Sequence, residues 1–204
     1  MNKTSEEPII LPIGYKQVEY LESTGTQRIT TDIIPTSTTS VYLDFQLTEV
    51  ENTRAICGGH YGNVQRFYVL HVSSNGYFSD ANVRGTVVEL IQADTNRHIY
   101  KFNIAEHSIK LDNTVNSTWS TAGWTDPTTG TGLGIFWRSN YGSLAPAKCK
   151  IYSCIIKDSV TNTKIGEFIP CLDDQDVPCM YDIVSKNTYY NTGTGTFNYG
   201  SIVN

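Results

Sequence analysis

The chain has 204 residues, of which 39% are hydrophobic and 17% charged, and its formal net charge is −5. Thr, Ile, Val, Tyr and Phe together number 78, whereas Ala, Leu and Met together number 19. β-Branched and aromatic side chains favour strands over helices, so this composition excludes a helical bundle and a βαβ protein with crossover helices. The acidic balance without a basic stripe argues against nucleic acid as a partner. No apolar run approaches the roughly 20 residues that span a bilayer, so we expect no membrane insertion.

Residues 1–13 are predicted to form an extended arm, because two prolines flank the apolar triplet at 9–11. Such an arm is either a disordered terminus or a segment that docks on a neighbouring subunit, and we expect docking within an oligomer. The arm lacks the layout of a signal peptide, so we expect either no export by that route or a signal already removed. Residues 14–204 contain no linker-like stretch and are predicted to form one domain.

Short strand-like runs separated by turn residues follow from Tyr15 onward, roughly every 8–12 residues. In the run 41–47, Val41, Leu43 and Phe45 fall on one face and Asp44 on the other, which predicts a half-buried strand in an antiparallel sheet. This spacing is typical of an antiparallel two-sheet β-sandwich of jelly-roll type. The predicted strands, in chain order, are 17–21, 27–34, 41–47, 66–72, 77–78, 86–91, 97–104, 107–111, 133–137 and 147–157.

The segment 119–131 interrupts this pattern with aromatic residues on a Gly- and Pro-containing loop. Exposed rings beside polar side chains suit either sugar stacking or a protein contact. Trp119 and Trp137 are predicted to belong to the core, Trp137 because it ends an apolar strand. The predicted ligand-binding residues are Trp124, Asp126, Arg138, Asn140 and Tyr141.

Five cysteines are an odd number, and none forms a C-x-x-C pair, which argues against zinc. They are predicted to be buried free thiols that pack as small hydrophobic groups. The alternative is a bridge between Cys171 and Cys179 in an oxidising compartment. We predict no disulfide in the native protein.

Signals for catalysis are weak. Glycan hydrolases on jelly-roll folds carry Glu-x-Asp-x-x-Glu on one strand, and no glutamate here is followed two residues later by Asp. The four histidines have no metal-binding spacing, and a Ser–His–Asp triad assembled from distant residues is not visible in a sequence. We therefore predict no enzyme activity, no metal and no cofactor.

Segments near both ends of the chain resemble the concanavalin A-like (laminin-G-like) jelly-roll modules of bacteriophage structural proteins and gut-bacterial surface proteins. The resemblance implies a two-sheet sandwich whose first and last strands lie near each other. Such folds host lectins, glycan hydrolases and structural modules, so the resemblance does not fix the function. The resembling segments are 11–27, 29–35, 147–157, 168–171, 180–184 and 191–197.

The leading functional hypothesis is a non-enzymatic structural module of a bacteriophage virion, a head-decoration, fibre or tail component that attaches to a protein or a glycan. The alternative is a secreted bacterial lectin-like domain that binds carbohydrate at the cell surface or outside the cell. A glycan-active enzyme with an unrecognised site is the third class. The expected partners are other virion or surface proteins, reached through the arm, and a glycan used for adhesion.

Overall fold

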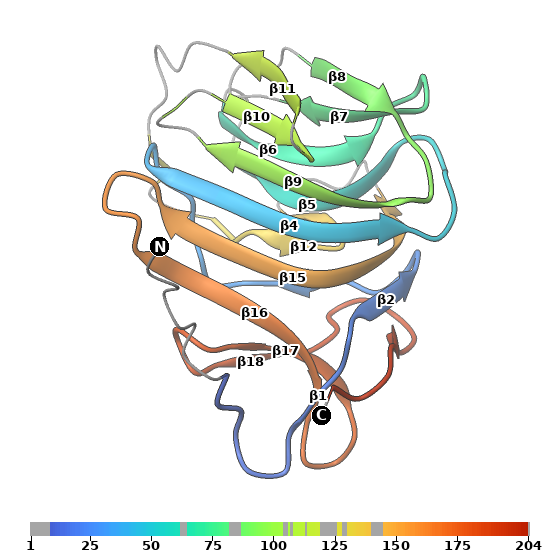
Figure 1. The fold of residues 1–204 in the computed structure, drawn as a ribbon, viewed down its shortest axis with the longest axis vertical. Helices are drawn as coiled ribbons and strands as arrows, with labels where there is room; N and C mark the ends of the chain where they lie inside the picture. The colour runs from blue at the N-terminus through green and yellow to red at the C-terminus, as the bar shows by residue number, and fades with distance from the viewer. Residues whose placement is uncertain are drawn as a thin grey trace, which may run out of the picture.

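A computed structural model describes residues 9–61, 65–81, 87–103, 106, 108–112, 114–118, 126–127, 130–139 and 145–203. Within these ranges the chain forms strands and turns but no helix, and the strands make two facing sheets (Figure 1). The predicted antiparallel β-sandwich of jelly-roll type is confirmed. The described ranges contain no helix long and apolar enough to cross a membrane, and no cluster of three or more metal-binding side chains.

The larger sheet has the strand order β11-β10-β9-β4-β15-β16-β17-β18. In addition, β1 pairs with β16, and β2 pairs with both β15 and β19. Every pairing in this sheet is antiparallel among the described residues. Its strands are β1 (Lys16–Gln17), β2 (Leu21–Thr24), β4 (Thr39–Leu47), β9 (Arg97–Asn103), β10 (Ser108–Leu111), β11 (Thr114–Thr118), β15 (Lys148–Asp158), β16 (Lys164–Leu172), β17 (Pro178–Asp182), β18 (Thr188–Tyr189) and β19 (Asn198–Tyr199).

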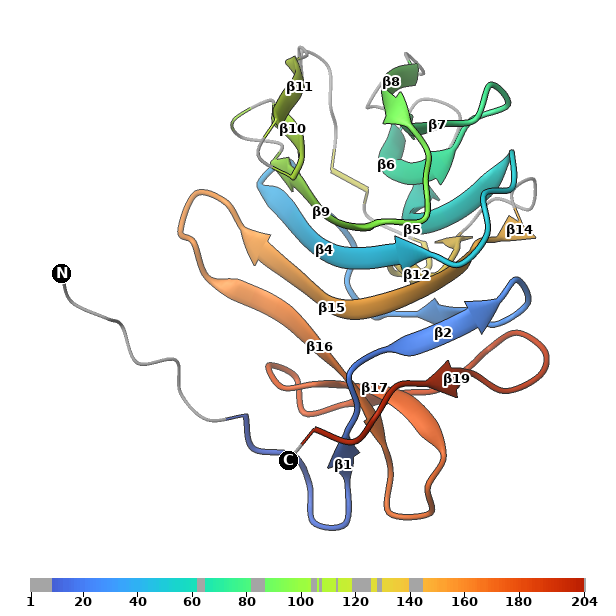
Figure 2. The same ribbon diagram turned by 45° about the vertical axis from the view of Figure 1, so that its right-hand side comes forward.

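The smaller sheet has the order β3-β12-β5-β6-β7-β8 and lies behind the larger one (Figure 2). Two short strands, β13 and β14, pair with β5 in parallel, while the other pairings in this sheet are antiparallel. Its strands are β3 (Ile29–Thr30), β5 (Arg54–Tyr61), β6 (Gln65–Val72), β7 (Tyr77–Ala81), β8 (Val87–Gln92), β12 (Gly134–Ile135), β13 (Arg138–Ser139) and β14 (Ala145–Pro146).

The core lies between the two sheets and follows from alternation along each strand. On β4 every second residue is buried, as the sequence predicted for Val41, Leu43 and Phe45. The ring of Phe45 meets that of Phe78 on β7 edge to face, with centroids 5.4 Å apart. Because Phe45 and Phe78 come from opposite sheets, this contact joins the two layers of the sandwich.

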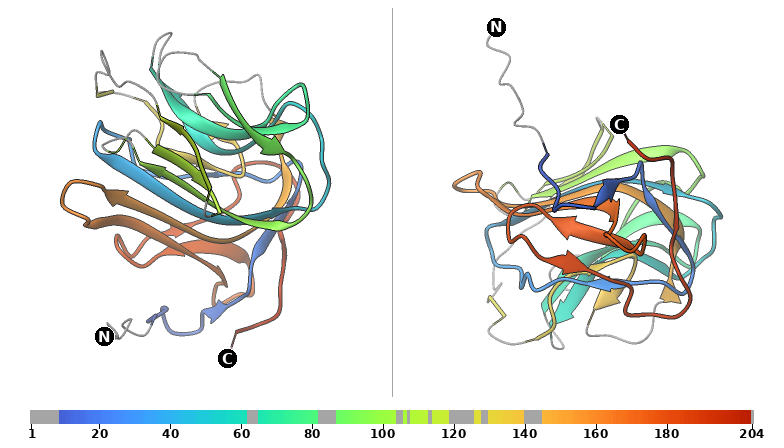
Figure 3. Two further views of the ribbon diagram at one scale, coloured as in Figure 1. Left: turned by 45° about the horizontal axis from the view of Figure 1, so that its top comes forward. Right: turned by 90° about the horizontal axis from the view of Figure 1, so that it is seen from below.

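The two chain ends meet in the larger sheet, as the resemblance implied. β2, near the start of the chain, pairs with β15 on one side and β19 on the other, and both of these strands belong to the C-terminal half (Figure 3). Val18 also pairs with Ile202. The predicted strands 17–21 and 27–34 do not pair with each other, because β2 joins the larger sheet and β3 joins the smaller one.

Residues 23–28 near the start of the chain contact residues 191–196 near its end. We call this contact region the terminal knot. The amide of Gln27, a residue only 3% exposed, is its centre. Gln27 Oε1 accepts a 2.8 Å hydrogen bond from the Thr24 backbone N–H, and Gln27 Nε2 donates to the Thr196 carbonyl at 3.1 Å. Gly193 packs so closely that an added Cβ would lie 2.1 Å from the Thr26 carbonyl oxygen.

Several strand predictions differ from the structure. The predicted strand 17–21 is interrupted between β1 and β2, and β11, β16 and β17 were not predicted as strands. The run 27–34 pairs regularly only at Ile29–Thr30, because the chain crosses there between the sheets. The run 133–137 pairs only at Gly134–Ile135, since Phe136 has a φ of 71° and turns the chain. The strand Arg54–Tyr61 was missed because its glycine pair, Gly58–Gly59, is untypical of strands.

Trp137 is half-buried and not a full core residue. Its indole N–H donates to the Ile29 carbonyl at 2.8 Å, and the guanidinium carbon of Arg28 lies 4.4 Å from the ring centroid. The ring therefore braces the terminal knot against the smaller sheet. Trp119 lies outside the described residues.

All five cysteines are buried, as predicted. Cys171 and Cys179 face each other on β16 and β17, with sulfur atoms 3.4 Å apart. Burial raises the pKa of the Cys149 thiol, which keeps it protonated and unreactive. The absence of disulfides stays a prediction, to be checked by counting thiols in denaturant without reductant.

In the described part of the predicted arm, some apolar side chains pack on the domain and others are exposed to solvent. Leu11 packs on the chain's own cluster of Cys171, Cys179 and Tyr181. Ile10 and Ile13 are 74% and 100% exposed. Docking of the arm on a neighbouring subunit stays a prediction.

Candidate functional site

Two of the five residues predicted to bind a ligand lie in the described ranges. The exposed Asp126 accepts a 2.6 Å hydrogen bond from the Ser37 backbone N–H, in the turn that precedes β4. Arg138 is 6% exposed and pairs with Gly58 of β5. The other three, Trp124, Asn140 and Tyr141, lie outside the described residues, so ligand binding by this set stays a prediction.

A second candidate lies on the outer face of the larger sheet, on the side of β4 that faces away from the core. Alternation places Ser40, Tyr42, Asp44 and Gln46 there, all half-buried. The neighbouring strands β9, β10 and β15 add their own polar residues to this face. The outer face is therefore a polar and aromatic surface carried on a rigid sheet.

A pocket of about 180 Å³ opens on this face, which we call the sheet pocket. It is large enough for several waters and thus for one sugar ring or one charged substituent. Two rows of register partners across β15, β4, β9 and β10 form it. The first row is Ile155, Tyr42, Lys101 and Lys110, and the second is Lys157, Ser40, Asn103 and Ser108.

The side chains of the sheet pocket provide three kinds of contact. The Tyr42 ring is an aromatic surface, with the Lys101 ammonium 5.7 Å from its centroid. Burial, and then the nearby Asp44 carboxylate, raise the pKa of Tyr42, so its phenol stays neutral at physiological pH. The Ser40 hydroxyl donates to the Lys157 carbonyl at 3.4 Å and can still accept a hydrogen bond. Asn103 Oδ1 accepts from the Glu106 backbone N–H at 3.1 Å, so its NH₂ group can donate to a ligand. A ring face beside such groups suits a sugar, which has apolar C–H faces and hydroxyl edges.

Next to the sheet pocket, the polar and aromatic side chains of the outer face contact one another. Arg97 holds the Asp44 carboxylate with two hydrogen bonds of 2.7 and 2.8 Å, and its guanidinium carbon lies 3.6 Å from the Tyr152 ring centroid. The Tyr152 hydroxyl donates to Gln46 Oε1 at 2.8 Å, and the ring meets Tyr20 edge to face. Because these groups already have partners, this region positions the strands of the pocket.

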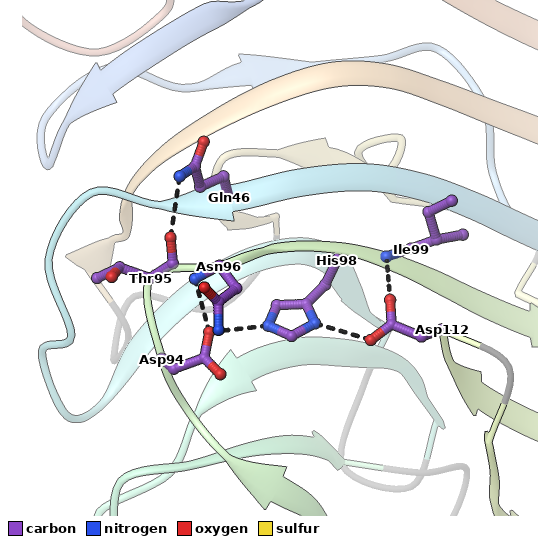
Figure 4. Close-up of polar contacts among 7 residues, drawn as sticks. All are labelled: Gln46, Asp94, Thr95, Asn96, His98, Ile99 and Asp112. Carbon is purple, nitrogen blue, oxygen red and sulfur yellow. Dashed lines mark hydrogen bonds and ion pairs between the residues drawn. The ribbon is translucent and has the colours of Figure 1, made fainter.

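On the inner face of β9, opposite Phe45 of β4, His98 is held between two carboxylates (Figure 4). It is 5% exposed, and its two ring nitrogens lie 3.0 Å from Asp94 and 3.0 Å from Asp112. Burial opposes the charged ring, but the hydrogen bonds to Asp112 and Asp94 outweigh it, so the pKa of His98 is raised. Burial likewise opposes ionisation of the two aspartates, yet hydrogen bonds keep the pKa of each lowered.

This arrangement is structural and does not form a catalytic triad around His98. With both nitrogens donating to carboxylates, the ring has no free lone pair to accept a proton from a nucleophile. Asp112 also accepts a 2.9 Å hydrogen bond from the Ile99 backbone N–H. The cluster therefore fixes β9 to the chain that follows β10, and both strands line the sheet pocket.

The sequence predicted the strands that carry this pocket but not how they are aligned with one another. The alternation in 41–47 and the strand at 97–104 were predicted, so Tyr42 and Lys101 could be placed on strand faces. Which residues of β15, β4 and β9 stand opposite one another depends on the register of strands whose facing residues lie more than 50 positions apart in the sequence. No local pattern in the sequence specifies that register.

Comparisons with known proteins identify a similar fold. No family model matches the chain, and no curated protein matches its sequence. Among solved structures, a candidate carbohydrate-binding protein from Bacteroides ovatus superposes with a TM-score of 0.60 at 11% sequence identity. The match covers 93% of this chain and 62% of that protein, so this chain spans less than two thirds of its length. At this identity the likeness concerns the fold alone.

Proposed function

We propose that this protein is a lectin-like module that binds carbohydrate without catalysis, and that the sheet pocket is its binding site. The observation that carries the proposal is the placement of Tyr42 beside Ser40 and Asn103 in a pocket on a rigid sheet. The fold shared with a candidate carbohydrate-binding protein supports it. Membership of the concanavalin A-like modules is part of the same proposal.

The comparison favours this reading over the bacteriophage structural role expected from the sequence. Carbohydrate binding also suits an extracellular or cell-surface location. Attachment to other proteins through the arm remains a separate proposal, which rests on the exposed Ile10 and Ile13.

A glycan panel followed by two matched variants tests the proposal. Tyr42→Ala is expected to weaken binding to any positive glycan about tenfold, because an aromatic contact is worth about 1–1.5 kcal/mol. Tyr199→Ala removes a ring that is 47% exposed on β19, outside the pocket, and is expected to leave binding unchanged. Equal loss in both variants, or none in Tyr42→Ala, would contradict the assignment.

Trp124→Ala on the same panel compares the two candidate sites. The sequence alone predicts a loss of about tenfold for this variant, by the same aromatic contact energy. The sheet pocket predicts no loss. Whichever of Trp124→Ala and Tyr42→Ala weakens binding identifies the surface that holds the glycan.

A further inference from the structure

The sheet pocket carries a concentration of positive charge on an acidic protein. Lys101, Lys110 and Lys157 line it, while the chain as a whole has a net charge of −5. Glu106 is the acidic residue among its lining residues, and it accepts a 3.2 Å hydrogen bond from the Ser108 hydroxyl. The described lining residues therefore carry a formal charge of +2 at neutral pH.

Two of these lysines stand in an unfavourable arrangement. Lys101 and Lys110 are direct register partners on the antiparallel strands β9 and β10. Like charges directly opposite each other in a sheet destabilise it. Lys157 approaches from β15 and donates to Asn162 Oδ1 at 3.3 Å. An anion placed in the pocket would relieve the repulsion between Lys101 and Lys110.

Two other lysines on this sheet contrast with these three because they pair with carboxylates. Lys148, at the far end of β15, contacts Glu49 at 2.7 Å and Glu51 at 3.3 Å. On β16, Lys164 pairs with Glu167. Lys150, on β15 outside the pocket, lies over the Tyr20 ring, 4.4 Å from its centroid. Carboxylates therefore neutralise Lys148 and Lys164, whereas three lysines gather inside the pocket.

From this arrangement we infer that the sheet pocket binds the acidic group of a glycan, a carboxylate or a sulfate carried on the sugar that contacts Tyr42. The inference rests on the proposed function and names its ligand class. Lys101 and Lys110 contact the anion, Ser40 and Asn103 contact hydroxyl groups, and Tyr42 contacts the ring. Lysine ammonium groups act as point charges and accept either anion without a fixed geometry.

Two pairs of polymers test the charge: polygalacturonate against its methyl-esterified form, and dextran sulfate against dextran. Binding is measured by affinity electrophoresis and calorimetry on the full chain. We expect the acidic member of one or both pairs to bind at least about tenfold more tightly than its neutral partner. The pair that responds distinguishes a carboxylate from a sulfate.

Variants of the lysines locate the effect. Lys110→Gln and Lys101→Gln are each expected to weaken acidic-glycan binding about tenfold, since a hydrogen bond to a charged group is worth about 1.5 kcal/mol or more. Lys148→Gln is the control: Lys148 lies on β15, nine residues and about 30 Å along the strand from Lys157, so its removal is expected to leave binding unchanged. Without ligand, Lys110→Gln is expected to raise the melting temperature, because it removes the repulsion with Lys101.

The outcomes separate the inference from the proposed function. If neutral polymers bind as tightly as acidic ones and Tyr42→Ala still weakens them, the charge inference is wrong and carbohydrate binding stands. If neither these polymers nor the panel binds, both are wrong. If the lysine variants weaken binding but Tyr42→Ala does not, or if single-stranded DNA binds as tightly as polygalacturonate, the pocket is an unselective anion surface and the inference is overturned.

Discussion

The terminal knot and the sheet pocket are both built from polar side chains on the same sandwich, yet their contacts differ. In the knot, the Gln27 amide is buried and both of its polar atoms are paired with nearby backbone. In the pocket, Lys101 is exposed and stands opposite another lysine. Polar groups that hydrogen-bond within the protein stabilise the fold. Polar groups held in an arrangement that lowers stability, such as facing lysines, indicate a ligand-binding site. Mutations should therefore separate the two regions by stability and by binding.

The largest expected effect comes from removing residues 188–204, which deletes the C-terminal half of the knot. Tyr189 and Phe197 would be lost from the core, where Tyr189 meets Phe168 and Phe197 meets Phe136. Losing a buried aromatic side chain costs about 3–5 kcal/mol, so the truncated chain is expected to lose cooperative unfolding. Thermal melting measured by circular dichroism checks this, and an unchanged melting temperature would show that the C-terminal segment is dispensable.

Gln27→Ala tests the centre of the knot with a single change. It leaves the Thr24 N–H and the Thr196 carbonyl without their partner, which costs about 2–3 kcal/mol of the free energy of unfolding. Gln175→Ala, in an exposed turn, is the control and should change little. Urea unfolding measures both. Glycan binding by folded Gln27→Ala protein should match that of the unmodified chain, and a selective loss of binding would end the distinction between the two regions.

The His98 cluster predicts a pH dependence of stability at the inner face of β9. Because the pKa of His98 is raised on folding, its contribution is fully present below the unfolded value near 6.5 and is lost as pH rises through the folded pKa. Because the pKa values of Asp94 and Asp112 are lowered, their contribution is present above the unfolded value near 3.8 and is lost as pH falls through the folded values. The cluster therefore contributes most between these limits.

His98→Gln is the variant that isolates this effect. It should remove about 1–2 kcal/mol of stability in weakly acidic buffer and less at alkaline pH, where the unmodified chain has already lost the charged contacts. Urea unfolding across the pH range measures the difference between the two proteins. A difference that stays constant with pH would contradict a charged His98.

The smallest expected effect on stability belongs to the pocket itself. Tyr42 is half-buried on the outer face, so Tyr42→Ala should change the free energy of unfolding by less than about 1.5 kcal/mol, the lower end of the range for a fully buried large side chain. Urea unfolding of this variant, beside Gln27→Ala, completes the comparison. A loss as large as that of Gln27→Ala would make Tyr42 a structural residue and would remove the pocket from consideration.

Much of the fold followed from local pattern. The composition excluded helical architectures, and the alternation around Leu43 and Phe45 assigned one face of β4 to the core. The predicted strand 147–157 is confirmed as β15, whose 11 residues make it the longest strand in the described ranges. These features were predictable because they depend on neighbours one or two positions away, where backbone geometry alone decides which face a side chain occupies.

The errors occurred where the chain leaves regular structure. Phe136 turns the chain within an apolar run that reads as a strand, because Trp137 is held at the Ile29 carbonyl 108 residues away. The predicted strand 27–34 likewise pairs regularly only at Ile29–Thr30, where the chain crosses between the sheets. Local residue preferences do not reveal such contacts, since the partner belongs to the other end of the chain.

Local sequence patterns were enough to predict that this protein is built of strands, that Tyr42 and Lys101 alternate with core residues, and that its two ends resemble one family of sandwiches. The pairing of distant strands was needed to learn that Lys101 faces Lys110, that Lys157 joins them from β15, and that Gln27 links residues 23–28 to residues 191–196. The reason is physical: a side chain's face is set by the backbone of its own strand, whereas its neighbours across the sheet are set by the register of strands, which depends on the packing of the whole core.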